Sequence, residues 1–155
     1  MGCMNEGTNE DVCSVCGYDK KSKNPDDCLP VKYILSSKYI IGACLSKNSE
    51  SITYMGFDCE RNKAVSIKEY FPLNVAVRNP DKTVSVVNGK DFAYNEGLME
   101  FLELNGKLKT VEAPALVPIF AVFEENGTAY SVSSVVNGIT LTDFLERNGG
   151  KLRWE

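Results

Sequence analysis

The sequence predicts an α+β domain, in which a mostly antiparallel sheet packs against one principal helix and a short cysteine-rich segment comes first. Several stretches alternate apolar and polar residues with the period of two that is typical of half-buried strands. Asn126-Gly127 separates two of these stretches and is a strong signal for a β-hairpin turn. One long stretch, residues 91–110, has apolar side chains at helical spacing.

The composition is that of an ordinary globular protein. A chain of 155 residues forms one domain with a small appendage, and 43% hydrophobic and 25% charged residues are average values. A net charge of −4 offers no basic surface to nucleic acid or to an anionic membrane. No apolar run is long enough to span a bilayer, and the N-terminus lacks the basic and apolar regions of a secretory signal. We therefore expect a cytoplasmic protein that binds neither nucleic acid nor a membrane.

Residues 1–28 are polar and cysteine-rich, and the sequence contains no histidine. A zinc site must therefore use cysteine or carboxylate ligands. In Cys13-x-x-Cys16-Gly17 two thiolates are placed to hold one ion, because the glycine allows the positive φ of a tight turn. Cys3 and Cys28 are the candidates that complete a four-sulfur zinc site. Unpaired thiols in a flexible tail, or a redox pair, are the alternatives.

The next residues lead into the sheet. Residues 22–30 contain two prolines and two neighbouring aspartates, and this composition predicts a linker. Strands are expected at 39–45 and 51–57, and we interpret Cys44 and Cys59 as small core residues near them.

Residues 65–72 read Val-Ser-Ile-Lys-Glu-Tyr-Phe-Pro and predict a third strand that ends at the proline. A lysine on such a strand is held straight, so Lys68 can present a fixed charge to an anion; the alternative is an ordinary solvated lysine.

The remaining expected elements are a small hairpin of 75–78 and 83–87, a helix at 91–110 capped by Asn88 or Asp91, a hairpin of 117–124 and 128–134, and a short helix at 140–147 that begins at Thr140.

This order of elements resembles the small, nucleotide-binding lobe of bacterial serine/threonine protein kinases. The resemblance is specific in residues 67–72 and 123–130 and extends over residues 29–155. It implies a five-stranded antiparallel sheet with one main helix, truncated before the large lobe. It also implies that residues 1–28 form a zinc-ribbon-like segment in front of that lobe.

The resemblance also implies a nucleotide site. Lys68 falls on the lysine that pairs with the phosphates of ATP, which binds with magnesium. Thr53 and Ser66 fall on the adenine side, where the family has valine and alanine. Residues 133–138 fall on the hinge, whose backbone contacts adenine.

Several positions depart from the family pattern. Ser46, Asn48 and Ser51 stand where the three loop glycines belong, so they are nucleotide-contacting positions that have lost backbone freedom. Glu50 adds a negative charge near the expected phosphates. Leu104 replaces the helix glutamate that pairs with the strand lysine, so we expect no such ion pair.

No His-Arg-Asp or Asp-Phe-Gly triplet occurs, so this chain alone cannot transfer phosphate by the kinase mechanism. One hypothesis is a degenerate, pseudokinase-like lobe with a regulatory or partner-binding role and weak or no ATP binding. A second is the ATP-binding part of an active kinase whose catalytic lobe is not in this chain. A third is a zinc-ribbon adaptor. The expected partner is another protein or the kinase large lobe.

Overall fold

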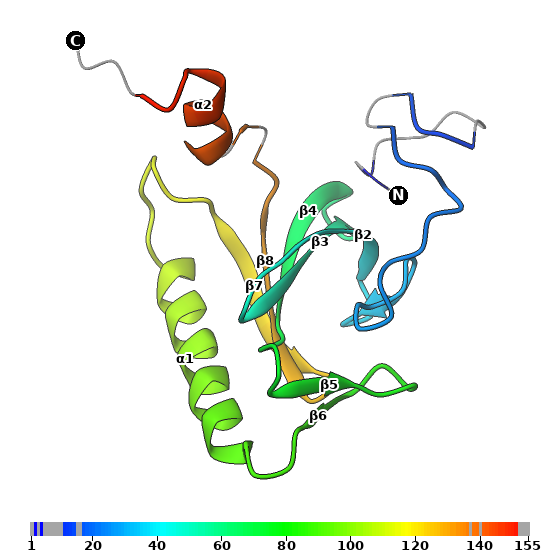
Figure 1. The fold of residues 1–155 in the computed structure, drawn as a ribbon, viewed down its shortest axis with the longest axis vertical. Coiled ribbons are helices and arrows are strands. Elements are labelled where there is room, and N and C mark those ends of the chain that lie inside the picture. The colour runs from blue at the N-terminus through cyan, green and yellow to red at the C-terminus, as the bar shows by residue number, and fades with distance from the viewer. Residues whose placement is uncertain are drawn as a thin grey trace.

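The computed structural model describes residues 2, 4, 11–14, 17–136, 138–139 and 141–151. Its centre is an antiparallel sheet of six strands in the order β1-β2-β3-β4-β8-β7, with helix α1 beside it (Figure 1). Strands β5 and β6 form a separate two-stranded sheet. The strands are β1 Ile34–Leu35, β2 Tyr39–Lys47, β3 Ser51–Asp58, β4 Lys63–Tyr70, β5 Ala76–Arg78, β6 Val84–Val86, β7 Ile119–Glu125 and β8 Thr128–Ser134. The helices are α1 Asp91–Lys109 and α2 Leu141–Arg147.

The prediction of five strands is wrong by one, because the short strand β1 extends the sheet. It pairs with β2 through Ile34 opposite Ile40 and Leu35 opposite Tyr39. A strand of two residues cannot display a period of two, so sequence alternation could not reveal it. The other five strands and the small β5-β6 hairpin lie where they were expected.

The connection between β7 and β8 is the predicted hairpin turn. Asn126 and Gly127 have φ values of 55° and 74°, the left-handed conformation that two-residue hairpin turns require. The predicted cap of α1 is wrong. The residue before the helix is Lys90, and no side chain caps its amides.

The segment before the sheet is not a linker, in contrast to the prediction for residues 22–30. The Asn24 side-chain amide donates to the carbonyl oxygens of Leu29 at 2.8 Å and Gly42 at 2.9 Å. Its oxygen accepts a hydrogen bond from the Cys44 backbone amide at 2.8 Å. Leu29 is fully buried. One asparagine and one apolar anchor therefore fasten this segment to β2.

The sheet has two faces of different character. On β4, Val65, Ile67 and Glu69 are buried in the closed core, whereas Ser66 and Lys68 lie on the opposite face. The closed core also contains the largest fully buried side chains: Tyr39, Tyr54, Tyr130, Leu29, Leu35, Ile41 and Ile52.

Glu69 is the centre of a buried polar network in that core. One carboxylate oxygen accepts hydrogen bonds from the Tyr54 hydroxyl at 2.7 Å and from Arg78 at 2.6 Å, and the other accepts from the Tyr130 hydroxyl at 2.8 Å. Arg78 also donates to the Asp27 carbonyl oxygen at 3.2 Å. The network joins β3, β4 and β8 to the β5-β6 hairpin and to the segment before the sheet.

Helix α1 closes over the end of β4 on the other face. The Tyr70 ring lies 5.3 Å from the Tyr94 ring and 5.8 Å from the Phe101 ring, and its hydroxyl donates to the Tyr94 carbonyl oxygen at 3.2 Å. Gly97 permits this approach, because a Cβ atom there would lie 2.3 Å from the Tyr70 hydroxyl oxygen. Among the described residues, neither helix is both long and apolar enough to cross a membrane.

Candidate ligand-binding groove

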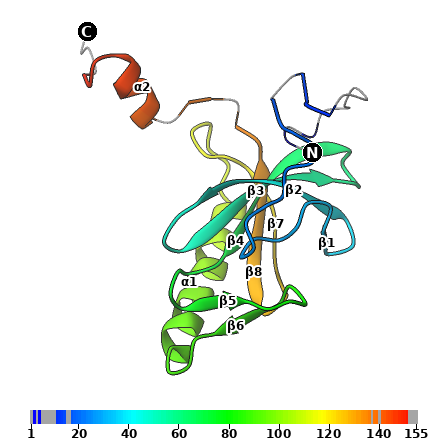
Figure 2. The ribbon, with the colours of Figure 1, turned by 45° about the vertical axis from the view of Figure 1, so that its right-hand side comes forward.

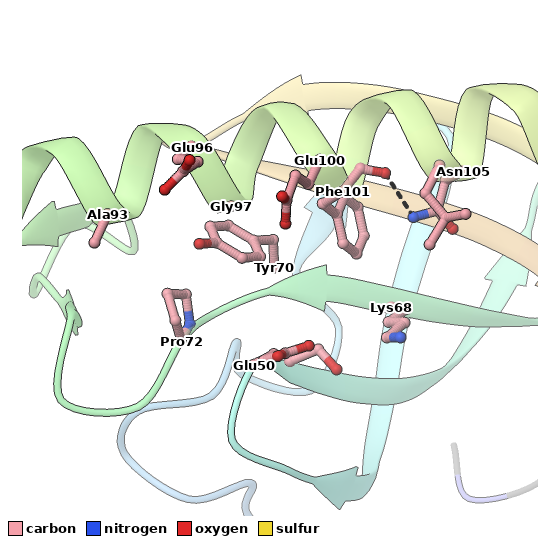
Figure 3. A pocket seen from close by; sticks show the side chains of 12 residues that line it. Glu50, Lys68, Tyr70, Pro72, Ala93, Glu96, Gly97, Glu100, Phe101 and Asn105 are labelled. Atoms are coloured by element: carbon pink, nitrogen blue, oxygen red, sulfur yellow. Dashed lines mark hydrogen bonds between the residues drawn. The ribbon is translucent and has the colours of Figure 1, made fainter.

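Three neighbouring cavities form a groove with Lys68 near its middle. The front cavity, of about 380 Å³, lies between α1 and the end of β4 (Figure 3). The inner cavity, of about 290 Å³, shares Lys68 and Asn105 with the front cavity. The hinge cavity, of about 360 Å³, shares Ser66, Val117 and Ser133 with the inner cavity. Because each cavity shares lining residues with the next, the three lie side by side along the sheet.

Strand register places the polar residues of the groove in rows. Lys68 of β4 lies opposite Thr53 of β3 on one side and Ser131 of β8 on the other. In the next row on the same face, Ser66 lies opposite Ser133. Side chains two residues apart on a strand share a face, so these five side chains project from one surface of the sheet.

Lys68 is exposed and has no hydrogen bond or ion pair with any described residue. The helix position expected to hold its glutamate partner is Leu104, an exposed side chain in the lining of the front cavity. The neighbouring Glu103 pairs instead with Lys107 on the outer surface of α1. Within the part of the chain that the structure describes, Lys68 therefore has no glutamate partner on α1.

In the loop between β2 and β3, the side chain of Asn48 forms hydrogen bonds with backbone amides of the same loop. The Asn48 side-chain oxygen accepts hydrogen bonds from the amides of Glu50 at 2.9 Å and Ser51 at 2.8 Å, and from the Ser51 hydroxyl at 3.1 Å. Amides of this kind bind phosphate oxygens in a glycine-rich loop. Lys47 pairs with Asp27. Neither these two amides nor this lysine is free to meet a phosphate.

The front cavity is acidic. Glu50, Glu96 and Glu100 line it together with Lys68, so three carboxylates oppose one ammonium group (Figure 3). Tyr70 lies among them, and its pKa is raised by burial and by the charges of Tyr94, Glu50 and Glu100. Two like charges about 4 Å apart repel by roughly 1 kcal/mol in water and more in a partly buried site. This end of the groove therefore disfavours a polyanion.

The hinge cavity is mainly apolar. Its walls include Leu45, Met55, Val117, Val135 and Val136, and it lies where the chain leaves β8. Apolar walls of this kind suit a planar ring that is not highly charged. Asn137, which belongs to the expected hinge, lies outside the described residues.

Four of the six expected nucleotide residues line the front or inner cavity: Ser51, Thr53, Ser66 and Lys68. Ser46 on β2 and Asn48 in the following turn are outside these linings. Sequence reasoning missed Asn105 and Ser131 of the inner cavity, and it expected Ser133 only as part of the hinge backbone. The two serines alternate with the buried Tyr130 and Val132, so period two along β8 was the signal that could have found them.

The tight turn expected at the cysteine pair is present around its described residues. Gly17 has a φ of 70°, and its amide donates to the Cys13 carbonyl oxygen at 2.8 Å. Cys3 and Cys16, two of the expected zinc ligands, lie outside the described residues. Among the described residues, no three histidine, cysteine, aspartate or glutamate side chains are grouped to hold a metal. Zinc binding stays a prediction.

Cys28, the fourth expected ligand, lies beside a different cysteine. Its Sγ is 3.6 Å from the Sγ of Cys44, and Cys28 is buried in the core. Burial, together with the neighbouring Cys44, raises the pKa of the Cys28 thiol to about 12. Cys44 is partly buried and packs against the core, as expected, but the interpretation of Cys59 as a core residue is wrong because it is exposed.

Comparison with known proteins supports the fold. No family model matches the chain, and no curated protein matches it. Among solved structures, the chain is similar to PpkA-294 in its apo form, a fragment of a bacterial serine/threonine kinase, with a TM-score of 0.74 and 26% sequence identity. The match covers 78% of this chain and 43% of that structure. The chain therefore has a kinase-like small-lobe fold and spans less than half the length of that structure.

Proposed function

We propose that this chain is a degenerate, pseudokinase-like small lobe with a regulatory or partner-binding role and with weak or no ATP binding. The main support is the front cavity, where Glu50, Glu96 and Glu100 oppose the single charge of Lys68. Any triphosphate that reached Lys68 would lie against these carboxylates, and their repulsion would offset the attraction of one lysine. The loop amides held by Asn48 remove a second source of phosphate binding.

The C-terminal part of the chain supports a partner-binding role. Helix α2 projects away from the sheet in both views of the fold (Figures 1 and 2). It contains no buried residue, and Leu141 is 64% exposed. Val136, just after β8, is 65% exposed. Apolar side chains gathered on one exposed segment are typical of a surface that another protein covers.

Two alternatives each have an observation in their favour. The free Lys68 side chain and the apolar hinge cavity favour the ATP-binding part of an active kinase, whose other lobe would be a separate or further part of the protein. The tight turn between Cys13 and Gly17 favours a zinc-ribbon adaptor.

A thermal-shift experiment with ATP, with and without magnesium, separates these functions. A ligand that binds only the folded state raises the unfolding midpoint once its concentration exceeds the dissociation constant. We expect no shift at millimolar ATP for the wild type, Lys68→Ala or Lys63→Ala, the last being a control on the same strand. A shift that Lys68→Ala abolishes and Lys63→Ala retains would contradict the proposal and favour an active kinase. Stoichiometric zinc without nucleotide binding would favour the adaptor.

A further inference from the structure

The inner cavity contains more hydrogen-bonding capacity than the protein uses. Its polar lining consists of Thr53, Ser66, Lys68, Asn105, Ser131 and Ser133. Apart from the Asn105 amide, which donates to the Phe101 carbonyl oxygen at 2.7 Å, none of these side chains makes a hydrogen bond or ion pair with a described residue.

Ser131 is the most informative of them. The residue is only 4% exposed, and its hydroxyl makes no hydrogen bond with a described residue. Because no buried side-chain oxygen of the described residues lacks a partner, this hydroxyl is open to the groove. A hydroxyl that the fold does not use and that faces a cavity can exchange a water molecule for a ligand atom. Since Ser131 lies beside Lys68 on the neighbouring strand, a ligand held by the lysine can also accept a hydrogen bond from this hydroxyl.

The charge of the cavity defines the charge of the ligand. Among the residues that the structure describes, Lys68 is the only charged one in the linings of the inner and hinge cavities. Beyond it, toward the front cavity, stand three carboxylates that disfavour any further negative charge. A ligand with one negative charge at Lys68 satisfies both conditions, whereas a neutral molecule or a polyphosphate satisfies only one.

The remaining walls define the body of the ligand. The apolar part of the inner cavity is lined by Leu108, Leu116, Val117 and Ile119. The adjoining hinge cavity continues the apolar surface through Met55, Val135 and other residues. Cavities of about 290 and 360 Å³ are at the small end of the range for ligand sites, so the body is compact.

We propose that the groove binds a compact organic monoanion, in which a carboxylate meets Lys68 and the serine and threonine hydroxyls while a planar apolar body lies toward the hinge cavity. The chemistry of this site differs from that of a triphosphate site. A small molecule bound there would act as a regulatory ligand of the proposed lobe. It rests on the proposed function only in that the groove is not occupied by ATP.

The test uses the full chain and 2-naphthoate as the probe, with isothermal titration calorimetry as the readout. 2-Naphthamide has the same rings without the charge, and naphthalene-2,6-dicarboxylate carries a second charge. We expect 2-naphthoate to bind about tenfold or more tightly than either. The amide lacks the charge-assisted hydrogen bond to Lys68, and the second carboxylate of the dicarboxylate would lie toward the hinge cavity, whose lining has no cation among the described residues. This comparison of ligands on the wild type does not depend on how any variant folds.

Matched variants locate the site. We expect Lys68→Met to weaken 2-naphthoate binding about tenfold or more, and Ser131→Ala about threefold or more. Lys63→Met, on the same strand, and Ser85→Ala, on β6, lie outside the linings of the groove and should leave binding unchanged.

Any one of three results would overturn the monoanion site. These are equal affinities for 2-naphthoate and 2-naphthamide, no binding of 2-naphthoate, and equal losses of affinity in Lys68→Met and Lys63→Met. Those results would leave the proposed regulatory function standing. Tight ATP binding that depends on Lys68 would overturn both the proposed function and this inference. The two failures are therefore distinguishable in one series of titrations.

Discussion

Replacing Arg78 with Met should destabilise the fold strongly, although Arg78 does not line the groove. The side chains of Arg78 and Glu69 are 2% and 0% exposed, and the charged atoms are 2.6 Å apart. Burial lowers the pKa of Arg78, but the hydrogen bond to Glu69 and its charge outweigh this effect and raise the pKa overall. The arginine therefore stays charged, and its removal leaves a buried carboxylate without a counter-charge.

The expected loss follows from the partners that remain. Breaking a buried ion pair from one side costs about 3–5 kcal/mol of unfolding free energy. After Arg78→Met, Glu69 still accepts hydrogen bonds from Tyr54 and Tyr130, so we expect the lower end, about 3 kcal/mol. Adding Glu69→Gln removes the remaining charge and keeps one side-chain oxygen, which can still accept a hydrogen bond from one of the two tyrosines. The double variant should therefore be more stable than Arg78→Met alone.

Urea unfolding followed by circular dichroism measures these differences, and the four proteins form a double-mutant cycle. The exposed pair of Glu103 and Lys107 on α1 is the matched control, since its ions remain solvated. Glu103→Gln and Lys107→Met should leave the unfolding midpoint unchanged. A loss below about 1 kcal/mol for Arg78→Met, or additive effects in the cycle, would refute the reasoning, because buried partners are coupled.

Three further predictions concern Cys28, Gly106 and Gly97. Because the folded pKa of Cys28 is about 12, the folded state keeps a proton that the unfolded chain loses, and stability should fall as the pH rises from about 8.5 toward 12. Cys28→Ala should remove this part of the pH dependence in thermal denaturation, whereas Cys59→Ala should retain it; identical profiles would contradict the burial of Cys28. Gly106→Ala should stabilise α1 by about 1 kcal/mol in urea unfolding, since a Cβ there meets nothing within 4 Å. Gly97→Ala should instead destabilise the protein, because its Cβ would displace Tyr70, and a gain in stability there would show that α1 does not pack this closely.

Much of the fold could be predicted because its signals are local. Alternation along β4 and β8 and the Asn126-Gly127 turn depend only on neighbouring residues, and the structure contains these elements. The segment containing Asn24 was misinterpreted because its prolines and aspartates resemble a linker. Its order comes from hydrogen bonds to Gly42 and Cys44, which are about twenty residues away in the sequence, and no local pattern predicts them.

The candidate groove was predictable only in part, for a related reason. The strand pattern placed Lys68 and Ser66 on one face, and the resemblance to kinases indicated a nucleotide site there. The acidity of the front cavity depends on where α1 packs, which brings Glu96 and Glu100 opposite Glu50. Helical spacing puts Glu96 and Glu100 on one side of the helix but does not say which side faces the sheet.

Lys68 and Glu69 are adjacent on β4, and their different surroundings separate structural from functional polar groups. Glu69 accepts three hydrogen bonds in the closed core, so its chemistry is already used by the fold. Lys68 faces the groove, where neither it nor the neighbouring Ser131 has a partner among the described residues. Polar groups that stabilise the fold should lower stability when they are removed, whereas groups held for a ligand should alter binding and leave stability nearly unchanged. Comparing Glu69→Gln with Lys68→Met in both unfolding and 2-naphthoate titration therefore tests whether the two faces of this sheet have separate roles.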